Sequence, residues 1–195
     1  MTRRLSAAAI GIPAALLLTG CASDPLAEQY KEGSNKGYIA GDGSVTEIPD
    51  AERGAAIRFS GTTETGEEIS SEDFDGEVLV VNFWYAACAP CRAEAADLQL
   101  LSAEYDGKGA QFIGVNVYDQ AGTALSFNET YGITYPSILD VNDGAVKLAF
   151  TGTVPPKAVP TTIVLDKKGR PSARILGQLK DPSILSTLIS DAIDE

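Results

Sequence analysis

The residues best suited to chemistry are Cys88 and Cys91, which are separated by two residues in the stretch WYAACAPCRAE. A pair with this spacing can bind a metal ion, form a structural disulfide or act as a redox couple. The chain has no histidine and no second cysteine pair. Structural zinc needs four ligands, and covalently attached haem needs a histidine directly after the second cysteine. We therefore expect neither a metal nor any other cofactor.

A purely structural disulfide is weakly motivated. It would close so short a loop that the chain-entropy model assigns it only about 2 kcal/mol of stabilisation. It would also join two points that a single helical turn already holds together. A structural role stays open, but the sequence gives it little support.

The redox interpretation is favoured by the position of the pair. Cys88 follows a predicted buried strand and begins a predicted helix, where unpaired amides and the helix dipole stabilise a thiolate. Cys91 lies one turn further, where it can resolve a mixed disulfide. It also begins the apolar face of the helix, which continues through Ala95, Leu98, Leu101 and Tyr105. We predict that Cys88 is the exposed nucleophile and Cys91 the shielded, resolving thiol.

The elements around the pair alternate between strands and helices. Strands are expected at 78–83, 111–117, 137–139, 161–166 and 173–179, and helices at 90–105, 121–131 and 145–150. A last helix begins with Asp181 as its N-cap and Pro182 at its first position. A hairpin is expected from 56–59 to the segment near Ile69. This order predicts an α/β fold with a mixed central sheet flanked by helices.

The N-terminus reads as an export signal. Arg3 and Arg4 precede a short apolar run at 7–19, which is too short to span a bilayer. The run ends in Leu-Thr-Gly-Cys21, which resembles the bacterial lipobox, although an ordinary signal peptide is the alternative. We expect a lipoprotein signal peptide at 1–20, a lipidated Cys21 that begins a flexible tether at 21–53, and a folded domain at 54–195. Apolar residues near Val45 and Ile48 can add a strand to that domain.

The charge balance restricts the partners. The chain carries 15 basic and 27 acidic residues, for a net charge of -12. Such a chain repels phosphate backbones and anionic head groups, so we expect no nucleic acid partner and no electrostatic docking to membranes. The lipid on Cys21 is the expected membrane attachment, on the extracytoplasmic face of the bacterial cell membrane.

Three stretches together resemble the TlpA/ResA branch of the thioredoxin superfamily. They are VVNFW followed by CAPC and Arg-Ala-Glu94, ITYPS at 133–137, and VPTT at 159–162. The resemblance covers about residues 55–195, and it implies a thioredoxin fold with an N-terminal β-hairpin and a central insertion. It also implies a membrane-tethered thiol–disulfide oxidoreductase, usually a reductase. Its implied partners are exported thiol proteins such as apocytochrome c, and a membrane thiol–disulfide electron donor.

The resemblance assigns roles to individual residues. Pro160 matches a cis-proline that faces the cysteine pair and offers the backbone of Val159 to a substrate chain. Glu94 matches a carboxylate that accepts the proton of Cys91, although a solvated charge at the helix N-terminus is the alternative. We place Trp84 with Val159 and Pro160 at the substrate-binding site, and we expect its side chain to pack under the active-site loop. Ala87 departs from the family, which usually has tryptophan there, so the substrate preference is open.

Other functions are less well supported. A net oxidant that introduces disulfides uses the same chemistry and differs only in redox potential. Thioredoxin-fold peroxidases place threonine three residues before the reactive cysteine, where this chain has Tyr85. A non-catalytic adaptor that only holds client thiols is a third alternative.

Overall fold

A computed structural model describes residues 44–153 and 158–195. The predicted signal peptide, Cys21 and most of the predicted tether therefore lie outside the described residues. Within the described ranges, no helix combines the length and the apolar character that crossing a membrane requires.

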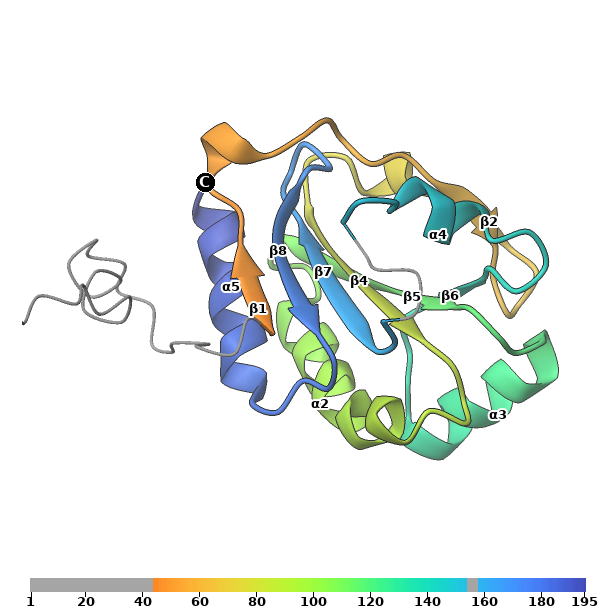
Figure 1. The fold of residues 1–195 in the computed structure, drawn as a ribbon. Helices are drawn as coiled ribbons and strands as arrows, with labels where there is room; N and C mark the ends of the chain where they lie inside the picture. Colours follow the sequence, from red (N-terminus) through yellow and green to blue (C-terminus); the bar gives the residue numbers. More distant parts are fainter. Residues whose placement is uncertain (1–43, 154–157) are drawn as a thin grey trace, which may run out of the picture. The chain divides into compact units, whose positions relative to one another are not determined.

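The domain is built on a six-stranded mixed sheet with the strand order β1-β8-β7-β4-β5-β6 (Figure 1). The central β4 pairs in parallel with β5 and antiparallel with β7. All seven residues of β4 are buried, as expected for a continuous β-branched and aromatic run. The strands are β1 (Val45–Glu47), β4 (Val78–Trp84), β5 (Ala110–Asn116), β6 (Ser137–Leu139), β7 (Thr161–Leu165) and β8 (Pro171–Leu176). The predicted mixed α/β fold is confirmed.

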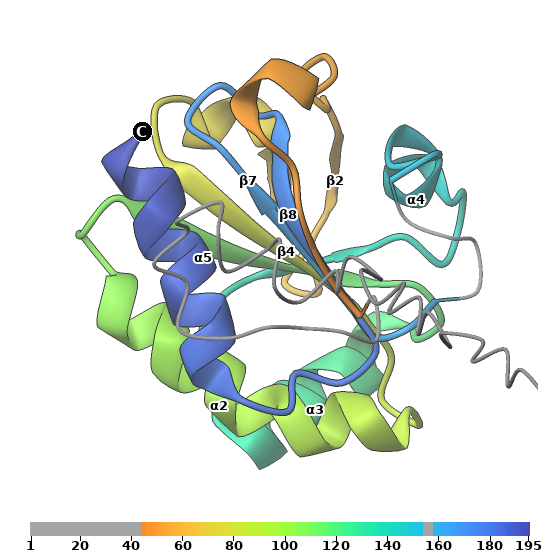
Figure 2. The ribbon, with the colours of Figure 1, turned by 60° about the vertical axis from the view of Figure 1, so that its left-hand side comes forward.

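Helices cover both faces of the sheet (Figures 1 and 2). On one face, α2 (Ala89–Tyr105) and α5 (Pro182–Asp194) pack with Val78 and Val80 of β4. On the other face, α4 (Ala145–Ala149) packs with Val81 and Phe83. The third long helix, α3 (Ala121–Tyr131), lies beside α2 and ends at Gly132, whose φ of 68° is left-handed. These four helices of the described residues lie where the sequence predicts them. Pro90, Gly132 and Asp181 mark an end of each of the three long ones.

The N-terminal hairpin is present, but its first strand begins later than predicted. It consists of β2 (Ser60–Thr62) and β3 (Glu68–Ser70), followed by the short helix η2 (Ser71–Phe74). The expected strand at 56–59 is wrong because Phe59 instead turns into the core, where it is 7% exposed. Gly61 permits the close approach of β2, since a Cβ there would lie 2.5 Å from Cγ2 of Ile138.

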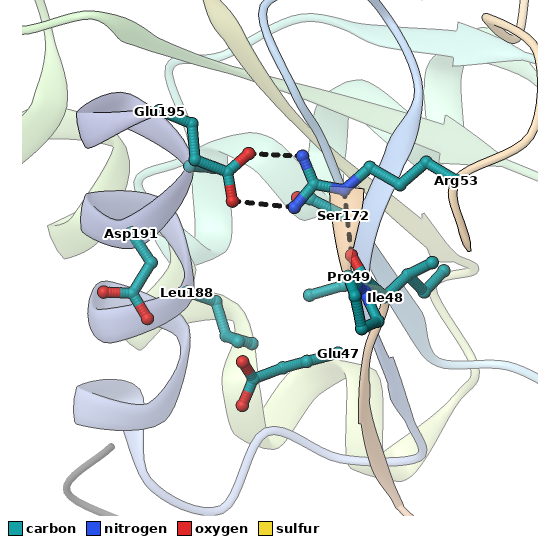
Figure 3. A pocket seen from close by; sticks show the side chains of 10 residues that line it. Glu47, Ile48, Pro49, Arg53, Ser172, Leu188, Asp191 and Glu195 are labelled. Atoms are coloured by element: carbon teal, nitrogen blue, oxygen red, sulfur yellow. Dashed lines mark hydrogen bonds and ion pairs between the residues drawn. The ribbon is translucent and has the colours of Figure 1, made fainter. Parts of the chain in front are cut away.

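Residues 45–53 pack against the domain, ahead of the boundary expected at residue 54. The first strand, β1, pairs antiparallel with β8 and is followed by the short helix η1 (Asp50–Glu52). Figure 3 shows Arg53 bonded to Glu195 of the last helix and to the carbonyl of Ile48. The tether prediction therefore runs about nine residues too far. The strand expected from the apolar residues near Val45 and Ile48 is present at 45–47, where β8 offers it a free edge.

Candidate active site

The two cysteines are joined by a disulfide at the start of α2. Cys88 is the N-cap of the helix, and its Cα lies 5.2 Å from that of Cys91. The amide of Cys91 donates to Sγ of Cys88 over 3.2 Å, and the amide of Cys88 donates to the carbonyl of Tyr85 over 3.1 Å. The first-turn amide of Cys91 is thus directed at the sulfur that the sequence assigns as nucleophile, where it favours a thiolate.

The expected contrast between an exposed Cys88 and a shielded Cys91 is wrong for this disulfide form. Cys88 is 3% exposed and Cys91 is 2% exposed. Both pack in one apolar cluster with Trp84 of β4 and with Ala124 and Phe127 of α3. The helical register correctly placed Cys91 on the inner face, but it could not show that α3 and the preceding loop also cover Cys88.

Trp84 lies beneath the cysteine pair. Its side chain is 4% exposed and its ring centroid lies 4.3 Å from that of Phe127. The indole N–H donates to Oγ of Ser137 over 3.2 Å, so the polar edge of this buried ring has a partner. Gly114 leaves the necessary space, because a Cβ at that position would lie 2.7 Å from the indole nitrogen. This position supports the loop from below.

Glu94 is fully buried, so it is not the solvated charge that was the alternative at this position. It is 1% exposed, and its two carboxylate oxygens accept from the side-chain amide of Asn82 (3.0 Å) and the backbone amide of Leu179 (2.7 Å). Burial raises the pKa of Glu94 to about 7, the two hydrogen bonds oppose that shift, and the charge of Asp97 adds to it. Glu94 therefore exchanges a proton near neutral pH.

The segment before β7 completes the site. The Val159–Pro160 peptide bond is cis, as expected, whereas the role of Val159 toward a substrate chain stays a prediction. Pro160 is buried, and its carbonyl accepts from the amide of Gly177 over 2.9 Å. Val159 is half-buried and packs against the cluster that holds both cysteines. The predicted site residues outside the N-terminal segment are thus gathered in one region.

Asp119 and Arg92 hold the loop before Cys88, and neither residue was predicted from the sequence. One carboxylate oxygen of Asp119 accepts from the backbone amide of Ala86 (2.6 Å) and from the side-chain amide of Asn116 (3.0 Å). On the other side of the same residue, the guanidinium of Arg92 donates to the Ala86 carbonyl over 3.1 Å. The signal was an Asn-x-x-Asp turn directly after a strand. Only the fold shows that this turn reaches the cysteine loop.

Comparison with known proteins decides the family. A model of the AhpC/TSA family matches residues 53–170. The chain belongs to the AhpC/TSA family. The thiol–disulfide oxidoreductase ResA of Geobacillus thermodenitrificans is 29% identical over 125 residues, which cover 64% of this chain and 69% of the relative. The resemblance to ResA-type proteins is therefore confirmed.

Solved structures agree with this assignment. A DsbF homologue from Corynebacterium diphtheriae is 34% identical with a TM-score of 0.67, and the match covers 79% of this chain and 96% of that one. A secreted thiol–disulfide isomerase from Corynebacterium glutamicum is 32% identical with a TM-score of 0.69, over 81% and 97% of the two chains. Like these relatives, the family member described here is a thioredoxin-like thiol–disulfide oxidoreductase.

Proposed function

We propose that this oxidoreductase is tethered outside the cytoplasm and reduces or exchanges disulfides in exported proteins through Cys88 and Cys91. The observation that carries the proposal is the amide of Cys91 directed at Sγ of Cys88 at the N-terminus of α2. In the reduced protein, the same first-turn amide stabilises the Cys88 thiolate, which is the reactive species in thiol–disulfide exchange.

The reaction proceeds in two exchanges. The Cys88 thiolate attacks one sulfur of the client disulfide, so that a mixed disulfide forms and the other client sulfur leaves as a thiolate and takes up a proton. The Cys91 thiolate then attacks Sγ of Cys88, the mixed disulfide breaks and the Cys88–Cys91 disulfide forms. The client's second sulfur leaves as a thiolate. Two electrons pass from the cysteine pair to the client.

Glu94 serves the second exchange. Cys91 must lose its proton before it attacks, in surroundings where burial keeps a thiol protonated. A carboxylate one helical turn further along α2, with a pKa of about 7, is matched to accept that proton at neutral pH. Asn82 holds the carboxylate in place and itself donates to Thr162 of β7 over 3.1 Å. Asn82 thus orients the base.

The client chain is held by the segment before β7. Val159 lies against the cysteine cluster, and its backbone is positioned by the buried Pro160. A client strand that pairs with the Val159 backbone brings its sulfur toward Cys88 with main-chain hydrogen bonds that are independent of client sequence. Trp84 contributes by supporting the loop rather than by touching the client.

The location is inferred from the N-terminal sequence and from relatives. Arg3, Arg4 and the apolar run before Cys21 support export and lipidation. The similar protein from C. glutamicum is described as secreted, and disulfides persist outside the cytoplasm. We include apocytochrome c among the exported clients, and a membrane thiol–disulfide protein as the electron donor.

The redox potential separates a reductase from the net oxidant. The full-length protein, purified in detergent, is equilibrated in glutathione buffers, and the fraction of Cys88–Cys91 disulfide is measured by mass spectrometry. We expect a potential well below that of strong oxidants, because neither Ala89 nor Pro90 supplies a charge that stabilises the reduced form. A value near -120 mV, about that of the strong oxidant DsbA, overturns the reductase assignment.

Trapping separates catalysis from passive binding of clients. Cys91→Ser cannot resolve the mixed disulfide, so it is expected to accumulate client proteins bound through Cys88. Adding Cys88→Ser is expected to abolish these adducts, because the attacking sulfur is gone. An adaptor without catalysis would hold the same clients in both variants.

The lipid anchor is tested by fractionation. We expect the unaltered protein to sediment with membranes and Cys21→Ser to lose that attachment. Equal membrane association of both proteins contradicts lipidation of Cys21 without bearing on the chemistry of Cys88.

A further inference from the structure

The stretch of chain that carries Cys88 is itself uncharged. Residues 84–91 contain no acidic or basic side chain, although the chain has a net charge of -12. Ala87 and Ala89 on either side of Cys88 are exposed, and Ala86 and Pro90 are half-buried. A client whose sulfur reacts with Cys88 therefore lays the residues next to its own cysteine on small apolar side chains.

One large side chain stands beside this surface. Tyr118 follows β5 and is 74% exposed. Among the large hydrophobic side chains of the described residues, none is more exposed. Its ring centroid lies 5.6 Å from that of Tyr85. Tyr85 is half-buried, packs against the cysteine cluster and accepts the amide of Cys88 through its carbonyl. The two rings thus form an aromatic pair that is continuous with the reacting disulfide.

The loop that carries Tyr118 is held firmly. Oδ1 of Asn116 accepts from the amides of Tyr118 (3.0 Å) and Asp119 (2.7 Å). Asp119 in turn holds the amide of Ala86, so the Tyr118 loop and the Cys88 loop are bonded to each other. An aromatic side chain on a preorganised loop loses little conformational entropy on binding, which is the property of residues that dominate interfaces.

The charges nearest to this surface are already engaged. Asp119 accepts from the amide of Ala86, and Arg92 donates to the carbonyl of the same residue. Both charged groups therefore hold the loop, and the aromatic pair is the feature beside it that can select apolar side chains. Aromatic rings select apolar or aromatic side chains through contact area and ring geometry.

We propose that Tyr118, supported by Tyr85, is a docking platform for an apolar or aromatic side chain two or three residues from the reacting cysteine of a client protein. This inference rests on the proposed exchange function and specifies the clients that it favours. Tyr85 links the two groups, because it packs against the cysteine cluster and its ring centroid lies 5.6 Å from that of Tyr118. Tyr118 is a specificity residue that touches the client and takes no part in electron transfer.

The test is a competition between a peptide and glutathione for a mixed disulfide with Cys88. Because the same type of bond forms in both cases, the ratio reports how well the peptide docks. The full-length Cys91→Ser protein is mixed with glutathione disulfide and one of two single-cysteine peptides, which differ only in Phe or Asn two residues from the cysteine. Cys88 first forms a mixed disulfide with one glutathione and releases the other as a thiol, and the peptide thiol then exchanges with the bound glutathione. Mass spectrometry then measures how much Cys88 is bound to the peptide and how much to glutathione. We expect the Phe peptide to be favoured over the Asn peptide about three- to tenfold.

Variants locate the source of that preference. Tyr118→Ala is expected to reduce the ratio to about one, whereas Tyr118→Phe retains it because the ring is retained. Leu148→Ala is the matched control, because Leu148 is 72% exposed but lies on α4, which packs on the other face of the sheet. It is expected to leave the preference unchanged. The inference is overturned if Tyr118→Ala keeps the preference for the Phe peptide, or if the protein that retains Tyr118 shows no such preference.

The outcomes also distinguish this inference from the proposed function. If Cys88 forms a mixed disulfide with glutathione but does not distinguish the peptides, only the docking platform is wrong. If Cys88 forms no mixed disulfide with glutathione or with either peptide, the exchange function itself fails, and the platform fails with it.

Discussion

Two buried carboxylates in this domain have opposite electrostatic surroundings. Glu94, near the cysteine pair, is 1% exposed, and Asp166, at the turn between β7 and β8, is 4% exposed. Both accept backbone amides. Asp166 also forms ion pairs with Arg53 and Arg170. Glu94 has no recorded ion pair with an arginine or lysine among the described residues. Its side-chain hydrogen-bond partner is the neutral Asn82.

The pKa values diverge accordingly. Burial raises the pKa of Glu94 to about 7 despite its two hydrogen bonds. Burial also acts to raise the pKa of Asp166, but the amides of Arg170 and Lys168 and the two guanidinium groups outweigh it, so that pKa is lowered. The comparison shows that burial alone does not make a carboxylate reactive. A buried carboxylate exchanges protons near neutral pH only where no cation holds its charge.

Asp166 belongs to a cluster of charged side chains that has a structural role. Asp50, Asp166 and Glu195 bring their oxygens within 4.8 Å of one another, but Arg53 and Arg170 form ion pairs with these same groups. The network joins η1, the β7–β8 turn and the end of α5, which Figure 3 shows in part. Its charges are satisfied internally, in contrast to the carboxylate near the cysteines.

The largest expected effect is the loss of stability on removing Asp166. Asp166→Ala removes the buried partner of Arg53, which keeps the more exposed Glu195, and it leaves the amides of Lys168 and Arg170 without their acceptor. We expect the free energy of unfolding to fall by about 3–5 kcal/mol, measured by urea titration. Asp75→Ala is the control, because it removes an exposed ion pair with Arg58 and should cost less than about 1 kcal/mol. Equal losses would mean that burial of the Asp166 pair has no energetic consequence.

The next effect is the pH dependence of stability that Glu94 causes. Between pH 4.5 and 7 the unfolded chain loses the Glu94 proton while the folded chain keeps it. The free energy of unfolding therefore falls as pH rises through this window, by about 3 kcal/mol in total. We expect Glu94→Gln to remove this fall in urea titrations across the same pH range. Asp166 has the opposite sign, because its lowered pKa adds stability that is lost as pH falls.

A control on the same helix sharpens this prediction. Glu104→Gln removes an equal charge from an exposed position on α2. It is expected to retain the decline of stability between pH 4.5 and 7. If Glu94→Gln shows the same decline as the unaltered protein, Glu94 is not the group responsible.

The smallest of the three effects is kinetic. Glu94→Gln is expected to slow the resolution step, in which Cys91 attacks the mixed disulfide, by at least about tenfold near pH 7. The rate should also lose its inflection near pH 7, measured by stopped-flow release of a fluorescent client peptide. Asp166→Ala, assayed under conditions where it is folded, is expected to retain both the rate and the inflection. An inflection that persists in Glu94→Gln assigns the base to another group.

The sequence predicted most of the fold because its signals are local. A continuous apolar run predicted β4, and Asp181 with Pro182 predicted the start of α5, since these patterns depend only on neighbouring residues. The first hairpin strand and the extent of the tether were misjudged. Gly61 packing on Ile138, and β1 pairing with β8, involve partners far along the chain.

The chemistry of the cysteine pair was determined by the sequence alone. The spacing of Cys88 and Cys91, the strand before them, the helix after them and the lack of histidine leave few alternatives to thiol–disulfide exchange. The tertiary structure decided how that pair is controlled. It buried Cys88 in one apolar cluster with residues of α3, brought the amide of Leu179 to Glu94 across 85 residues, and bonded Asp119 to the cysteine loop. Desolvation and the absence of a neighbouring cation set a pKa, and both arise only when distant segments pack together.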